Sequence, residues 1–175
     1  MEYAIVLLPL LGSIISGFFG KRLGAKSCQI LTSLFVSLSG ILSLFIFYEV
    51  FVHDYSSNKL IFNWISSGDF HVNWSINIDP LTSVMLVVVS LISSIIHFYS
   101  IGYMSHDPHK PRFMSYLSLF TFAMLTLVTA DNFLQLYFGW EGVGLCSYLL
   151  IGFWYKKPSA NAAAIKAFIV NRVGD

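Results

Sequence analysis

Long apolar runs alternate with short polar connections along the whole chain. Five of these runs approach twenty residues, the length at which a helix crosses the hydrocarbon core of a bilayer. They cover about 3–20, 28–52, 80–103, 111–130 and 132–154, and a sixth begins near Ser159 and still continues at Asp175. The pattern predicts an all-α fold, a polytopic transmembrane helical bundle of five full spans and the start of a sixth. Because the sixth run is too short to cross comfortably at 1.5 Å per residue, we expect the sequence to be a fragment of a longer product or of a truncated gene.

Residues at the ends of the runs support these boundaries. Asp79 and Pro80 combine an N-cap acceptor with a proline at the first helical position, where its missing N–H costs nothing. Pro111 and Ser159 open their runs in a similar way. Only Asp131 and Asn132 separate the fourth run from the fifth, so these two helices should be antiparallel neighbours.

The polar segment 53–78 divides the chain into helices at 1–52 and helices at 79–175. An apolar stretch from Leu60 to Ile65 is followed by the turn residues 66–69. Apolar and polar positions then alternate, with apolar Val72, Trp74, Ile76 and Ile78. Alternation on both sides of a turn predicts a β-hairpin. Its apolar face, with Trp64 and Trp74, should lie on the protein or at the membrane surface, as a structural lid rather than a binding site.

Basic residues predict the orientation in the membrane. Those that follow the first, third and fifth runs are Lys21, Arg22, Lys26, Lys110, Arg112, Lys156 and Lys157. Lys59 alone lies on the opposite side. The positive-inside rule then places the N-terminus outside and the hairpin on the extracytoplasmic side. The expected location is a bacterial inner (cell) membrane, with the mitochondrial inner membrane as the alternative. Because Glu2 precedes the first run and the positive charge follows it, this run should be a span rather than a cleaved signal peptide.

Composition narrows the function. The chain is 56% hydrophobic and 11% charged with a net charge of +1, which favours lipid as its surroundings and gives no reason to expect a nucleic-acid partner. It has no glycine-rich phosphate loop, cysteine cluster or histidine pair at metal spacing. We therefore expect no cofactor or metal in this chain, and any redox chemistry in an associated complex should take place elsewhere.

Charges within the runs are the strongest functional signal, because an ionisable group in hydrocarbon is costly and usually serves a use. Glu141 lies in the middle of the fifth run, among Gly139, Gly142 and Gly144, which should let another helix approach closely. Its position favours proton transport, with a protonated structural glutamate as the alternative. Farther along the chain, Arg172 and Asp175 share one helix face, and either they neutralise each other or one of them faces Glu141.

Two other ionisable residues within the runs are less informative. Lys166 lies near the inner interface, where its side chain can reach the headgroups, and it is also included among the candidate residues for proton translocation. His97 lies toward the inner end of the third run and could relay protons, but a hydrogen-bonded packing histidine is at least as good an interpretation.

Four segments of the sequence resemble one family. The run from Gly139 to Tyr155, GWEGVGLCSYLLIGFWY, resembles the fifth helix of the subunit L family of NADH–quinone oxidoreductase (complex I), which includes mitochondrial subunit 5. The run Lys166–Asp175, together with 78–82 and 100–104, is similar to the same family in the same order.

The resemblance implies an antiporter-like membrane-arm subunit that takes part in proton translocation coupled to electron transfer from NADH to quinone. It implies Glu141 as the switching carboxylate, with Arg172 and Asp175 linked to it. The partners implied are other membrane-arm subunits, the lipid bilayer and protons, while NADH, FMN, iron–sulfur clusters and quinone are expected on other subunits.

The family pattern also contains features that this sequence lacks. The lysine on the seventh helix that should pair with Glu141 is outside the sequence, so we expect that the chain cannot pump protons alone. The alternatives are a subunit of a multisubunit sodium/proton antiporter or membrane-bound hydrogenase, and a truncated paralogue that does not transport.

Overall fold

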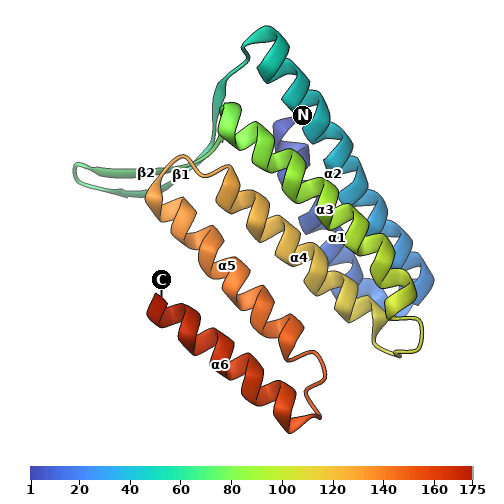
Figure 1. Cartoon of the computed structure of the whole chain (residues 1–175). Coiled ribbons are helices and arrows are strands. Elements are labelled where there is room, and N and C mark those ends of the chain that lie inside the picture. Colours follow the sequence, from blue (N-terminus) through green and yellow to red (C-terminus); the bar gives the residue numbers. More distant parts are fainter. Residues whose placement is uncertain (175) are drawn as a thin grey trace.

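The computed structural model describes residues 1–174 as a bundle of helices with a long hairpin projecting from one end (Figure 1). The elements, in chain order, are α1 (Glu2–Leu23), α2 (Ala25–His53), β1 (Ser57–Ser67), β2 (Phe70–Ile78), α3 (Pro80–Tyr103), α4 (Lys110–Val128), α5 (Phe133–Ile151) and α6 (Pro158–Gly174). Helix α4 packs against α1, α2, α3 and α5, and α6 packs against α5 at one side of the bundle.

Four helices are long and apolar enough to cross a membrane among the residues that the structure describes. They are α1, α2, α3 and α4. Helix α5 has 19 residues, but polar Gln135 and Glu141 and its glycines lower its hydropathy. Four of the predicted spans are therefore confirmed, and the fifth stays a prediction.

Asp79 and Pro80 begin α3 as predicted, whereas α6 begins at Pro158 and not at Ser159, because proline is itself well suited to the first helical position. The Asp79 carboxylate accepts a hydrogen bond from the Thr82 backbone N–H at 2.6 Å, and Pro80 follows at the first helical position. The Asn132 side chain accepts from the Gln135 backbone N–H at 2.9 Å, so the two-residue turn leads directly into α5. At its other end α5 is shorter than predicted, because the helix ends at Ile151 before Gly152 and residues 152–156 form turns.

The predicted hairpin is confirmed. Strands β1 and β2 pair antiparallel from Ser57 with Ile78 to Ser67 with Phe70, with irregularities near Ile61 and Trp64. Gly68 takes a φ of 57° in the two-residue turn, a conformation that glycine adopts without strain at the first central position of a tight hairpin. The base of the hairpin packs onto the helices, and the turn extends beyond them (Figure 1).

A line of hydroxyl groups joins the first four helices, and the sequence analysis did not identify it. The hydroxyl seam comprises the hydrogen-bonded side-chain pairs Ser13–Ser115, Ser37–Ser94, Ser43–Ser90 and Ser93–Thr121. Such bonds hold helices together where lipid provides no hydrophobic drive between them.

A hydroxyl group of α2 also replaces a backbone hydrogen bond that a proline removes from α1. Pro9 has no N–H for the Ile5 carbonyl, and the Ser39 hydroxyl of α2 donates to that carbonyl at 2.7 Å.

Candidate functional site

Two glycines set how closely α5 approaches α4. A Cβ added to Gly139 would lie 2.7 Å from the backbone N and Cα of Leu127, and one added to Gly142 would lie 3.1 Å from the Ala123 Cβ. A Cβ on Gly144 would meet nothing within 4 Å. The predicted role in close approach is therefore confirmed for Gly139 and Gly142, and it is wrong for Gly144, which lines a cavity between α4, α5 and α6.

This contact turns Glu141 toward α6. Two residues beyond Gly139, Glu141 is rotated by about 200° around the helix. Its Oε2 forms an ion pair with Arg172 Nη1. The Glu141 side chain is 18% exposed and that of Arg172 is 44% exposed. Of the two arrangements considered from the sequence, the structure therefore has Arg172 facing Glu141. Asp175 lies outside the described residues.

One face of α6 carries Arg172 to this position. Ala164, Phe168 and Arg172 are spaced by four residues and follow one face of the helix. Ala164 is buried, Phe168 contacts the Tyr148 ring of α5 at 5.5 Å between centroids, and the Arg172 guanidinium lies 4.9 Å from the Phe168 ring centre. The face of α6 that packs against α5 thus carries the Arg172 guanidinium at its C-terminal end.

Lys166 is not brought into this site. It lies two residues from both Ala164 and Phe168, about 200° around the helix, and it is exposed. Its predicted place among the site residues therefore has no support from the geometry of α6, whereas an exposed lysine suits the predicted contact with headgroups.

Tyr137 is a member of the site that the sequence analysis missed. It lies one turn before Glu141 on α5 and interacts with both Glu141 and Arg172. The spacing of four residues was a usable signal, because residues four apart lie one above the other on a helix.

The second carboxylate oxygen of Glu141, Oε1, is available for a further hydrogen bond. Oε1 is buried and has no hydrogen-bond partner among the described residues. A nearby cavity of about 240 Å³ lies between α4, α5 and α6, with Ser147 and Asn171 in its wall. The arrangement combines a charged pair with one free acceptor atom, so it can bind a proton or donor group at that oxygen.

His97 is a packing residue in this structure. Its side chain is 0% exposed, its Nδ1 lies 2.7 Å from the Ser93 carbonyl oxygen, and its Nε2 lies 3.0 Å from Ser118 Oγ. Nδ1–H therefore donates to the carbonyl and the Ser118 hydroxyl donates to Nε2. Both ring nitrogens have protein partners, which favours the packing interpretation over the relay.

The hairpin is attached to α5 near the site. The Gln135 side chain bonds both backbone groups of Ser75, accepting from its N–H at 3.2 Å and donating to its carbonyl at 2.7 Å. Trp64 and Trp74 both stack edge-on against Phe138, one turn before Glu141. The predicted contact of the two tryptophans with the protein is confirmed.

The fold and this site define a class. The chain is a multi-helix membrane protein that holds an arginine–glutamate pair between two adjacent helices, and charges so placed usually serve ion or proton movement. Known proteins make the assignment more specific. Residues 64–114 match the family described as NADH-Ubiquinone oxidoreductase (complex I), chain 5 N-terminus. Residues 130–175, which include Glu141 and Arg172, match NADH:quinone oxidoreductase/Mrp antiporter, TM.

Individual relatives are similar in sequence over all or nearly all of the chain. It is 59% identical over 175 residues to NADH-ubiquinone oxidoreductase chain 5 of Arabidopsis thaliana, covering 26% of that protein. It is 56% identical over 171 residues, or 98% of the chain, to NADH-quinone oxidoreductase subunit L of Rickettsia bellii, covering 27% of it. The chain belongs to this family of complex I chain 5 and subunit L proteins, as its resemblance implied, and it spans about a quarter of the length of these relatives.

Proposed function

We propose that the chain acts as part of an antiporter-like membrane-arm subunit of NADH–quinone oxidoreductase and takes part in proton translocation driven by electron transfer from NADH to quinone. The observation that carries the proposal is the Glu141–Arg172 ion pair between α5 and α6. The similarity to chain 5 and subunit L supplies the electron-transfer partner.

The pair supplies a simple means of coupling charge to proton binding. While Arg172 is in contact, its positive charge stabilises the Glu141 carboxylate. If a change in the surrounding subunits draws Arg172 away, a bare carboxylate remains in a medium of low dielectric, which is costly. Proton uptake at the carboxylate removes that cost, and return of Arg172 releases the proton.

The same proposal includes a topology. Helix α5 is the fifth span, the N-terminus and hairpin face outward, and the chain lies in an inner membrane. In support, the three basic connections gather at one end of the helices and the hairpin lies at the other (Figure 1). A single cysteine at Asp69→Cys should react with an impermeant maleimide from outside intact cells or mitoplasts, since Cys28 and Cys146 are buried.

The partners and cofactors follow from the family. Other membrane-arm subunits and the lipid bilayer surround the chain, and protons are the ion that it handles. NADH, FMN, iron–sulfur clusters and quinone belong to other subunits.

The test begins with assembly. Solubilised membranes are separated on a native gel, probed with an antibody to the hairpin and stained for NADH oxidation. Comigration with NADH activity supports the proposal, and migration only as a small free species overturns it.

Proton transport is tested next in the same membranes. In membrane vesicles that carry Glu141→Gln, NADH-driven acidification of the vesicle interior should fall. Oxidation of NADH by the other subunits of the complex should continue. Glu49→Gln is the matched control, because Glu49 is an exposed carboxylate in α2 without an ion pair among the described residues. Equal pumping by the two variants would refute the role of Glu141.

A sodium/proton antiporter subunit is the second candidate, because the match at 130–175 also covers Mrp antiporters. It predicts sodium-dependent proton exchange, with no comigration of NADH activity. A chain that assembles without contributing to either flux would be the non-transporting alternative.

A further inference from the structure

Positive charge gathers at the end of the bundle opposite the hairpin. Two contacts hold these connections together: Gly20 lies against Pro111, and Arg112 reaches the carbonyl of Phe153. The acidic residue closest to them in sequence, Asp107, accepts hydrogen bonds from the Trp154 indole at 3.1 Å and from the His109 backbone N–H at 2.7 Å.

Arg112 is partly buried, and its guanidinium contacts the connection that follows α5. Its Nη2 donates to the Phe153 carbonyl at 2.9 Å, and its guanidinium lies 4.6 Å from the Phe153 ring centre and 5.3 Å from that of Tyr155. Its Nε is buried and has no hydrogen-bond partner among residues 1–174, and no carboxylate in that part of the chain forms an ion pair with it. A half-buried guanidinium whose counter-charge is not supplied by the described chain favours an anionic ligand.

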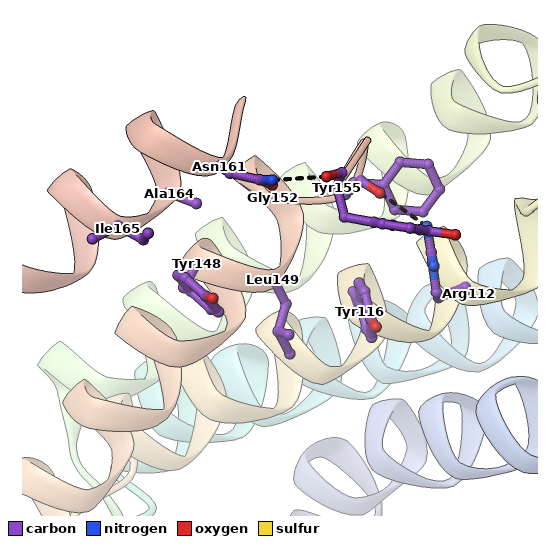
Figure 2. A pocket seen from close by; sticks show the side chains of 10 residues that line it. Arg112, Tyr116, Tyr148, Leu149, Gly152, Tyr155, Asn161, Ala164 and Ile165 are labelled. Carbon is purple, nitrogen blue, oxygen red and sulfur yellow. Dashed lines mark hydrogen bonds between the residues drawn. The ribbon is translucent and has the colours of Figure 1, made fainter. Parts of the chain in front are cut away.

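There is room for such a ligand on both sides of Arg112. A cavity of about 420 Å³ lies between α4, α5 and α6, and a second of about 620 Å³ lies between α1 and α4. Arg112 and Tyr116 line both cavities. Figure 2 shows the first cavity, with Arg112, Tyr116, Tyr148 and Asn161 around it. A guanidinium, phenol groups and an amide around one space match the donors that phosphate oxygens accept from.

The apolar side of this cavity continues along α6. Ile165 lines the cavity and is 52% exposed, and Ile169, one turn deeper on the same face of α6, is 55% exposed. A ligand with a phosphate at Arg112 would therefore have an apolar strip beside it that runs along a helix.

We propose that Arg112 and the cavities beside it bind the phosphodiester headgroup of an anionic phospholipid, with an acyl chain along Ile165 and Ile169. Basic pockets between spanning helices on the inner side are suited to such headgroups, and lipid headgroups lie at this depth. The guanidinium lies close to both the Phe153 and the Tyr155 ring, and a planar guanidinium is suited to paired bonds with two phosphate oxygens. The site is separate from Glu141, and it rests on the proposed function only for the orientation that places these connections on the inner side.

The test uses the 175-residue chain purified in a mild detergent and placed in nanodiscs of phosphatidylcholine alone or mixed with phosphatidylglycerol. Native mass spectrometry counts the phosphatidylglycerol that remains bound after release. We compare wild type with Arg112→Gln and with Arg22→Gln, because Arg22 is an exposed arginine at the same end. Loss of a charge-assisted pair of hydrogen bonds should weaken retention of phosphatidylglycerol by about tenfold in Arg112→Gln, and Arg22→Gln should retain it like wild type.

Three results would overturn the proposal. The first is equal retention by Arg112→Gln and Arg22→Gln. The second is displacement of the lipid by millimolar inorganic phosphate, which would point to a site for free phosphate. If Arg112→Gln does not fold by circular dichroism, Arg112→Lys replaces it, since lysine keeps the charge but loses the paired geometry. A severalfold loss of retention is then expected, and wild-type retention is the third contrary result.

Discussion

Replacing Gly139 with alanine should separate α4 from α5 and destabilise the bundle. The added Cβ would lie 2.7 Å from two backbone atoms of Leu127 and 2.8 Å from its Cβ. Because backbone atoms cannot rotate away as a side chain does, the helices themselves must move apart.

The magnitude follows from two opposing effects. Overpacking of a close contact costs about 1–3 kcal/mol, whereas alanine in place of glycine within a helix gains about 0.5–1 kcal/mol. The net expectation for Gly139→Ala is a loss of about 1–2 kcal/mol in the free energy of unfolding. Gly144→Ala meets nothing within 4 Å and should be neutral or stabilising. Gly142→Ala, with Ala123 Cβ at 3.1 Å, should lie between them.

The assay is unfolding of the purified chain in mixed micelles with increasing sodium dodecyl sulfate, followed by tryptophan fluorescence and circular dichroism. The three variants share one helix and one substitution, so differences among them report the space around each glycine. The order Gly139, Gly142, Gly144, from most to least destabilised, is expected. Equal stability of Gly139→Ala and Gly144→Ala would refute the close approach of α4 and α5.

Three further predictions use the same assay. Gln135→Leu removes both hydrogen bonds to Ser75 and leaves two buried backbone groups unpaired, so the free energy of unfolding should fall by about 2–4 kcal/mol. Limited proteolysis should also cut the hairpin faster. Wild-type values for both measurements would contradict the attachment of the hairpin to α5 through Gln135. The hydrogen bond and charge of Glu2 raise the pKa of Lys59. The pair should therefore contribute fully to the free energy of unfolding below the ordinary lysine pKa of about 10.4, and this contribution should decline as pH rises through the raised pKa. Lys59→Met should abolish that alkaline decline, and an unchanged pH profile would count against the pair. His97→Leu should cost about 1–3 kcal/mol, because it removes a hydrogen bond to the Ser93 carbonyl within α3 and one to Ser118 of α4. A stability equal to wild type would show that these bonds contribute nothing.

Much of the fold could be predicted because the relevant signals are local. A capping side chain and a proline mark the start of α3 within two residues, and alternation around Gly68 is enough for a hairpin. Neither depends on what packs against the segment. The end of α5 was predicted three residues too late, because the apolar residues after Ile151 continue the pattern although the helix stops at Gly152.

The site was predictable only in part. The position of Glu141 in an apolar helix identified it from the sequence, but whether Arg172 and Asp175 neutralise each other or one of them faces Glu141 stayed open. Which face meets α5 depends on packing across the 152–157 connection, and this packing brings Arg172 to the carboxylate and turns Lys166 away. The hydroxyl seam had a signal as well, since serine and threonine recur at three- and four-residue spacing in α2 and α3, but only the neighbouring helices show which hydroxyls pair.

The hydroxyl seam bears on how the chain enters the bilayer during synthesis. The hydroxyls of Ser90, Ser37 and Thr121 each also bond a carbonyl one turn earlier in their own helix, at 2.6, 2.7 and 3.1 Å. Such a hydroxyl is already satisfied when its helix stands alone in lipid. Helices α2, α3 and α4 can therefore leave the translocon with these hydroxyls already bonded, and the bonds between helices form later, as the inserted segments meet.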